Sequence, residues 1–244
     1  MADFKDTFGK ALVAHHRGEP ADHVIERDDG LIDEIDTGIY FLEYDDWPEF
    51  EKEAMLEAKG RVLDVGCGAG RAAVWLQERG HDVVGIDVSP LALEVSRLRG
   101  VRDCRLMDVR ELDFPDGAFD TVLMLGNNLG IGGDAGQTRR ILESLHRITA
   151  DEGIVIAETR DPLKTDDPAH LAYHERNRGM NRPPGLVKIR IGFRGEFDDW
   201  FEFLLLGEEG LAELLEPTGW TISRVYGSGG ATFVAILSKG PPGR

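Results

Sequence analysis

Residues 62–71 read VLDVGCGAGR, and this stretch decides how the rest of the chain is interpreted. An apolar run ends at Val65, and glycine follows at every second position from Gly66 to Gly70. Helix-forming residues come next, so the order predicts a strand, a tight turn and a helix. Glycine lets the backbone pass close to a ligand, and the start of a helix offers unpaired N–H groups. The stretch therefore predicts a site for a nucleotide-type cofactor.

The glycine turn alone does not say which cofactor binds. It departs from the dinucleotide pattern G-x-G-x-x-G, because Arg71 stands where the third glycine belongs. The P-loop pattern also fails, since no Gly-Lys-Ser/Thr follows. Asp64 precedes the first glycine by two residues, and its carboxylate would repel a pyrophosphate. An NAD-dependent oxidoreductase is therefore the alternative rather than the first interpretation.

Three later apolar runs also end in polar residues. Asp87 ends the second run, Asp108 ends the third, and Gly126, Asn127 and Asn128 follow the fourth. In open parallel sheets, ligands bind beyond the carboxyl ends of the strands. A carboxylate at the tip of the second strand can accept both hydroxyls of a ribose. The pattern predicts an α/β fold with a ligand site along one edge of a parallel sheet.

From about residue 61 to 161, the chain resembles the class I S-adenosylmethionine-dependent methyltransferases. The resemblance rests on the D-x-G-x-G-x-G motif at 64–70 and on the acids and asparagines after the next strands. It implies a doubly wound, seven-stranded, mostly parallel Rossmann-like sheet with an antiparallel last strand and an inserted β-hairpin or lid. It also implies methyl transfer to a small soluble acceptor by in-line displacement, for which positioning supplies much of the rate.

The resemblance also implies roles for individual residues. Those expected to hold S-adenosylmethionine are Asp64, Gly66, Cys67, Gly68, Gly70, Asp87, Val88, Asp108, Val109, Leu125 and Gly126. Asn127 and Asn128 are expected to face the methyl group and the acceptor. If the acceptor must lose a proton, the candidate bases are His15, His16, His170 and His174, and His174 is grouped with the asparagines as catalytic.

Other side chains are candidates for contacting the acceptor. Tyr40, Tyr44 and Trp47 form an aromatic group just before the first core strand. They either enclose the substrate or cover the sheet edge as part of the core. Arg160 and Arg190 either bind an acidic substrate or pair with neighbouring acids.

The expected organisation has four parts. They are an N-terminal lid at 1–58, a cofactor core at 59–160, an insertion at 161–206 and a closing segment at 207–244. Helices are expected over 4–16 in the lid, over 135–149 in the core and over 208–216 in the closing segment. The closing segment is also expected to hold a hairpin over 220–238. The insertion is expected to hold an irregular loop with a short helix near 169–177, then a hairpin over 187–206. That hairpin either caps the site or pairs with a second subunit.

Composition narrows the classes of function. Asp and Glu number 45 against 28 Lys and Arg, for a net charge of −17, which argues against a nucleic-acid partner. No apolar stretch is long enough to cross a membrane, and residues 1–5 lack a signal-peptide layout. Two cysteines, in the turn and the third run, favour a reducing compartment. We expect a cytoplasmic monomer or homodimer without a metal, and a catalytically silent cofactor-binding regulator is the non-enzymatic alternative.

Overall fold

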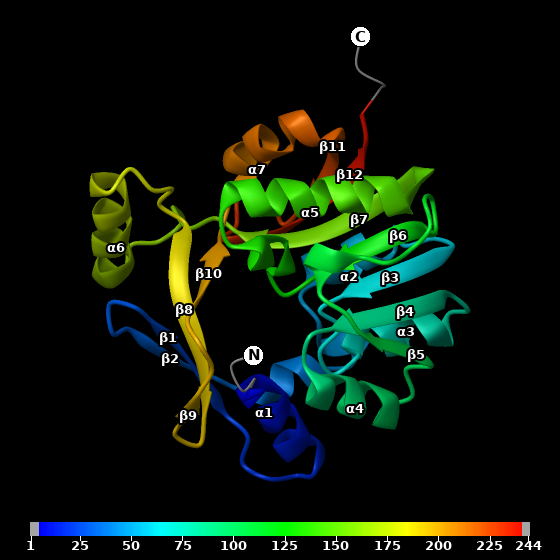
Figure 1. The fold of residues 1–244 in the computed structure, drawn as a ribbon, viewed down its shortest axis with the longest axis horizontal. Coiled ribbons are helices and arrows are strands. Elements are labelled where there is room, and N and C mark those ends of the chain that lie inside the picture. Colours follow the sequence, from blue (N-terminus) through cyan, green and yellow to red (C-terminus); the bar gives the residue numbers. More distant parts are fainter. Residues whose placement is uncertain (1–4, 241–244) are drawn as a thin grey trace. The chain divides into compact units, whose positions relative to one another are not determined.

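The computed structural model describes residues 5–240, and Figure 1 shows the helices and strands that they form. Contacts between residues divide the chain into two units. The first unit comprises the described residues up to Trp47, then Leu63–Glu111 and Lys188–Phe201. The second comprises Pro48–Val62, Leu112–Val187 and the residues from Glu202 onward. The first unit therefore contains the glycine turn and the acids that follow it, and the second contains the asparagines.

Seven strands form the main sheet in the order β11-β12-β7-β6-β3-β4-β5. Strand β4 pairs with β5 in parallel, as β6 does with β7, whereas β12 is antiparallel to both β7 and β11. This confirms the predicted fold class. The strands are β3 (Arg61–Val65), β4 (Asp82–Asp87), β5 (Asp103–Leu106), β6 (Phe119–Met124), β7 (Thr149–Arg160), β11 (Trp220–Tyr226) and β12 (Thr232–Lys239).

Local capping signals begin the helices of the first unit. Helix α3 (Arg71–Glu78) follows the glycine turn. Helix α4 (Pro90–Leu98) begins where Ser89 accepts the N–H of Ala92 at 2.8 Å, with proline in the first turn. Helix α1 (Thr7–His16) packs against α4, and Asp6 joins the two by accepting the N–H groups of Gly9 and Leu91. Phe4, where this helix was expected to begin, lies outside the described residues.

A second sheet has the strand order β10-β8-β1-β2, and most of its residues belong to the first unit. Strands β1 (His23–Arg27) and β2 (Ile32–Ile35) form an antiparallel hairpin around Gly30, and β1 also pairs with β8 (Leu186–Phe193). Strands β9 (Glu196–Phe197) and β10 (Phe201–Leu204) complete it. The β1–β2 hairpin was not predicted, although Asp29-Gly30 between two short segments that mix apolar and polar residues is a hairpin signal. The short helices η1 (Thr37–Phe41), η2 (Tyr44–Asp46) and η3 (Val109–Glu111) belong to the same unit.

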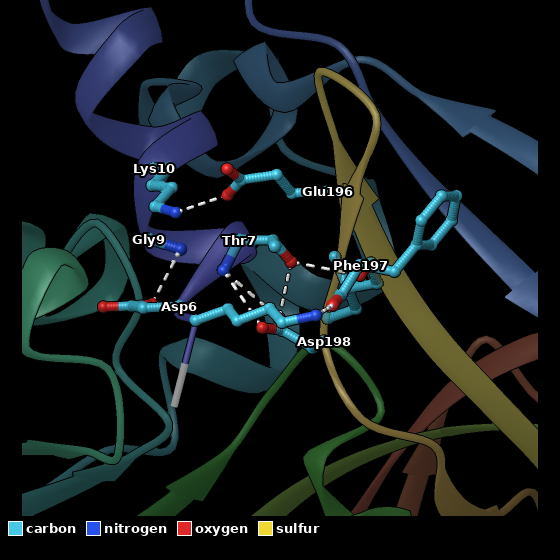
Figure 2. A network of polar contacts seen from close by, with 9 residues as sticks. Asp6, Thr7, Gly9, Lys10, Glu196, Phe197 and Asp198 are labelled. Carbon is cyan, nitrogen blue, oxygen red and sulfur yellow. Dashed lines mark hydrogen bonds and ion pairs between the residues drawn. The ribbon is translucent and has the colours of Figure 1, made fainter. Parts of the chain in front are cut away.

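The start of α1 is tied to the turn that follows β9, as Figure 2 shows. Asp198 accepts the N–H of Thr7 at 3.2 Å and its hydroxyl at 2.5 Å. Lys10 forms an ion pair with Glu196 at 2.6 Å. The exposed ion pair contributes little to stability, whereas the partly buried hydrogen bonds of Thr7 hold α1 to the turn after β9.

In the second unit, helix α5 (Ala135–Ile148) packs against β7 and begins as predicted, with Asp134 accepting the N–H of Gln137. The indole of Trp220 is buried and donates to the carbonyl of Leu142 on this helix at 2.9 Å. The remaining elements here are α2 (Glu49–Met55), η4 (Asn128–Gly132), α7 (Glu208–Leu215) and η5 (Glu216–Thr218).

Helix α6 (Pro168–Gly179) is longer than the short helix predicted inside the 161–206 insertion. Its start is fixed by Asp167, which accepts the N–H of Ala169 at 2.7 Å, and by Pro168 in the first turn. The ring of Tyr173 is buried, and the amide of Asn177 donates to the carbonyl of Leu186 at 2.8 Å. These tertiary contacts order a segment whose polar sequence looks irregular.

Candidate active site

The glycine turn between β3 and α3 has a backbone that favours glycine. The φ angles of Gly66, Gly68 and Gly70 are 66°, 54° and 77°, all in the left-handed region that side chains rarely adopt. The N–H groups of Gly66 and Cys67 both donate to the carbonyl of Ile86, at 2.8 and 3.0 Å. The turn is therefore pinned to the end of β4.

Helix α4 braces the same turn from its other side. The hydroxyl of Ser96 donates to the carbonyl of Gly68 at 2.7 Å, and the guanidinium of Arg99 donates to the carbonyl of Ala69 at 3.0 Å. A Cβ placed on Gly68 would meet no atom within 4 Å. The turn is rigidly held while one face of Gly68 stays open, as a backbone cradle for a ligand requires.

Asp64 carries an unsatisfied oxygen beside this turn. Its carboxyl accepts the N–H of Ala73, but Oδ2 has no hydrogen-bond partner among the described residues, and the residue is only 4% exposed. Burial raises the pKa of Asp64 to about 7; the positive charge of Arg71 opposes this and Asp87 adds to it. A buried carboxyl with a spare oxygen suits a cationic ligand group.

Asp87 organises the turn and also keeps capacity for a ligand. Its Oδ2 accepts the N–H of Gly68 at 3.0 Å, and its Oδ1 accepts the N–H of Ser89 at 2.9 Å. Each carboxylate oxygen has about two acceptor positions, so both oxygens can take a further donor. Burial raises the pKa of Asp87, although hydrogen bonds from the backbone N–H groups of Ser89, Gly68 and Val88 counteract it.

The end of β5 offers a third acid next to apolar surface. Burial alone would raise the pKa of Asp108, but the hydrogen bonds from Arg110 outweigh it and hold this pKa below its usual range. Val88 and Leu106, at the ends of the neighbouring strands β4 and β5, are apolar and exposed. Val109 is buried beneath this end. Acid and apolar surface together suit a flat heteroaromatic ring.

Cys67 lies within the turn but is not poised for chemistry. Its thiol is buried against the hydroxyl of Ser96 at 3.9 Å, and burial raises its pKa well above the usual value. The thiol therefore stays protonated and packs as a small apolar group. No group of side chains that could hold a metal ion occurs within residues 5–240.

In the second unit, strand β6 ends in a strained turn. Gly126 and Asn127 both have a φ of 63°, and the N–H of Gly126 donates to the carboxylate of Glu158 at 2.8 Å. The Oδ1 atom of Asn127 is buried and accepts no hydrogen bond from any described residue. Leu125 is buried just before this turn, and Asn128 begins η4 just after it. A left-handed non-glycine residue with an unsatisfied amide oxygen is typical of a functional position.

Comparison with known proteins assigns the chain to a family. A family model described as a methyltransferase domain matches residues 62–153. The phosphatidylethanolamine N-methyltransferase of Cereibacter sphaeroides is 32% identical over 142 residues, which span 53% of this chain and 67% of that protein. The structure of an S-adenosylmethionine-dependent methyltransferase from Bacteroides fragilis, in complex with S-adenosyl-L-homocysteine, matches with a TM-score of 0.82 and 27% identity. That match covers 96% of this chain and 95% of that one.

The chain belongs to the class I S-adenosylmethionine-dependent methyltransferases. The chain spans 50% of the length of the putative methyltransferase YqeM from Bacillus subtilis (strain 168), at 30% identity. It spans 52% of the length of the demethylmenaquinone methyltransferase of Thermus thermophilus, at 35% identity. No helix in the described part of the chain is long and apolar enough to cross a membrane.

The aromatic residues predicted to act together before the first core strand fall into two separate groups in the structure. Tyr44 stacks on Trp75 of α3 with ring centroids 4.6 Å apart, and Trp47 is buried between Trp75 and the guanidinium of Arg71, 4.4 Å from its ring. These two rings cover α3. Tyr40 lies apart from them and contacts other aromatic residues of the first unit.

The histidines predicted as candidate bases, and the two arginines predicted to bind the acceptor, differ in burial and in contacts. His174 is buried on α6 in the second unit, and His170 lies 3.3 Å from the hydroxyl of Thr165. His15 stacks on Phe41 at 4.3 Å, and His16 is exposed. The arginines also differ: Arg160 is exposed at the end of β7, whereas Arg190 pairs with Glu26 at 2.7 Å and lies over Phe197 and Trp200.

Two residues that the sequence did not single out, His23 and Phe8, contact the ring of Tyr40 in the first unit. His23 begins β1 and is 1% exposed. Its surroundings come from α1 and η1, so no local pattern marks it. Recognising the β1–β2 hairpin from Asp29-Gly30 would have placed it on an ordered strand.

Proposed function

We propose that this protein transfers the methyl group of S-adenosylmethionine to a small soluble acceptor. The observation that carries the proposal is the unpartnered, buried Oδ2 of Asp64 beside the open face of Gly68. A cationic amino-acid tail supplies the donor that this oxygen lacks. The pyrophosphate of a dinucleotide would instead place negative charge next to a buried carboxyl.

The residues of the first unit match the other parts of this cofactor. Asp87 can accept from the ribose hydroxyls, because the hydrogen bonds from Gly68 and Ser89 do not use all the acceptor positions of its carboxylate. Asp108 can accept from the adenine amino group, and Val88 and Leu106 offer apolar surface to the ring. When bound, S-adenosylmethionine supplies an activated methyl group on a sulfonium whose departure leaves a neutral thioether.

On the acceptor side, we propose that Asn127 and Asn128 orient the nucleophile. The unsatisfied Oδ1 of Asn127 accepts hydrogen bonds only, so it suits an N–H or O–H of the acceptor. His174 is kept as a candidate base on its burial and its place in the insertion. We further propose that the segments 1–58 and 161–206 serve the acceptor, since β1 from one pairs with β8 from the other.

Two measurements test the proposal. Calorimetry of the full chain with S-adenosylhomocysteine should show binding, while NADH should bind weakly or not at all; the reverse order would favour the oxidoreductase. Transfer of labelled methyl from S-adenosylmethionine to the low-molecular-mass fraction of a cell extract should then follow. Tight binding without any transfer would favour the catalytically silent regulator.

A further inference from the structure

His23 is held in one protonation form by its neighbours. Its Nδ1 lies 2.8 Å from the hydroxyl oxygen of Thr37, and that hydroxyl donates its only proton to the carbonyl of Ala21 at 2.5 Å. The Thr37 oxygen can therefore only accept from the imidazole, so Nδ1 carries the proton. Nε2 is then left with a lone pair, and no described residue hydrogen-bonds to it.

The surroundings keep this imidazole neutral. Burial lowers the pKa of His23, with the charge of Asp22 opposing the shift in part. Phe8 meets the imidazole edge-on with centroids 5.7 Å apart, and the ring of Tyr40 lies 5.8 Å away. A neutral ring with a fixed tautomer and an open lone pair is a ready hydrogen-bond acceptor.

The same aromatic residues lie against the glycine turn. Phe8 and Tyr40 pack on the apolar cluster that contains Ala69 of the turn. Arg99 reinforces this, because one guanidinium nitrogen donates to the carbonyls of both Ala69 and Tyr40, at 3.0 and 3.4 Å. His23 is thus one ring away from the backbone that we assign to the methionine part of the cofactor.

We propose that Nε2 of His23 accepts the hydrogen bond, and then the proton, of an N–H or O–H nucleophile on the methyl acceptor. This inference rests on the proposed methyl transfer. The nucleophile forms a bond to the methyl carbon as the carbon–sulfur bond breaks, and that electron pair stays on sulfur. The proton of the nucleophile passes to Nε2, and the resulting imidazolium returns it to water after the product leaves.

Two isosteric substitutions separate this role from a purely structural one. In His23→Asn the amide nitrogen takes the place of Nδ1 and can still donate to Thr37, but no atom reaches the place of Nε2. In His23→Gln the amide oxygen can instead reach the place of Nε2 and accept a hydrogen bond there, although it cannot take the proton, and the donor to Thr37 is lost. If His23 is only structural, His23→Asn should disturb the protein less than His23→Gln. If Nε2 binds the methyl acceptor, His23→Gln should keep more methyl transfer than His23→Asn.

The experiment measures three quantities on each full-length variant: the melting temperature, S-adenosylhomocysteine affinity, and labelled methyl transfer to the low-molecular-mass extract fraction. We expect His23→Asn to keep the fold and the affinity but to transfer methyl groups roughly 100-fold more slowly, at the low end of general-base contributions. His23→Gln should retain more transfer than His23→Asn despite a lower melting temperature.

Three results would overturn the inference. The first is a rate of methyl transfer by His23→Asn that equals the wild-type rate. The second is a rate of methyl transfer that falls in step with the melting temperature across the two variants. The third needs no variant: ¹⁵N shifts of the wild-type imidazole must report a proton on Nδ1, and a proton on Nε2 would exclude the role. If the wild type binds S-adenosylhomocysteine but transfers nothing, the proposed function itself fails, which is a distinguishable outcome.

Discussion

Binding of S-adenosylhomocysteine should release a proton from Asp64. The pKa of this carboxyl is about 7 in the free protein, mainly because it is buried. A ligand ammonium at the unpartnered Oδ2 favours the ionised form, so the pKa falls on binding and the proton leaves. Roughly 0.9 protons should be released per ligand at pH 6 and about 0.5 at pH 7, if the bound pKa lies near its ordinary value.

The same shift sets a pH dependence of stability. The folded pKa of Asp64 is raised from 3.8 to about 7, so its favourable contribution is complete below pH 3.8 and is lost as the pH rises through 7. The loss amounts to about 4 kcal/mol in the free protein. Asp64→Asn removes this dependence, and its stability should change less between pH 5 and pH 8 than that of the wild type.

Calorimetry in buffers of different ionisation enthalpy measures the released proton directly. Asp64→Asn reports any proton that comes from the ligand itself, and methylthioadenosine, which lacks the amino-acid tail, tests whether the ammonium is responsible. Release that persists in the variant, or that methylthioadenosine reproduces in full, would refute the assignment of the ammonium to Asp64.

Three further predictions concern the first unit. Asp87→Asn should weaken S-adenosylhomocysteine binding roughly tenfold or more, because a charged acceptor becomes a mixed donor and acceptor; unchanged affinity by calorimetry would contradict the ribose assignment. Gly68→Ala and Gly80→Ala both place a side chain at positive φ in open space and should cost about 1 kcal/mol each in urea unfolding, yet only the Gly68 change should weaken binding. Thr7→Val removes the hydroxyl donor to Asp198 and leaves the N–H donor of residue 7 in place. The change should destabilise the chain by about 1–2 kcal/mol in the same assay, and a smaller effect would show that α1 is held elsewhere.

The parts of the fold that follow from local signals were predictable. Ser89-Pro90 and Asp134 begin helices where expected, and the apolar runs before Gly66 and Asp87 form the expected parallel strands. The β1–β2 hairpin was missed because its strands are polar, and its stabilising partner β8 lies more than 150 residues away in sequence. The many acidic residues made the short alternation of apolar and polar residues in β1 and β2 hard to recognise, and the pairing of β1 with β8 stabilises these strands.

In the candidate site, too, some features could be predicted from local sequence and others depend on contacts between distant segments. Residue types at strand ends indicated Asp64, Asp87 and the asparagines, because those positions follow from the topology of the sheet. That Asp64 keeps an unsatisfied oxygen, and that His23 is locked by Thr37, depends on packing between distant segments. Such features have no local pattern and appear only in three dimensions.

The pairing of β1 with β8 has a consequence for trimmed versions of this protein. A version that began at the first core strand would keep β8 but leave one of its edges without hydrogen-bond partners over Ile189–Gly192. Bare strand edges recruit other chains, so such a version should associate with itself even while its parallel sheet stays intact. Insolubility after shortening would then reflect a lost neighbour and not a failure of the cofactor core.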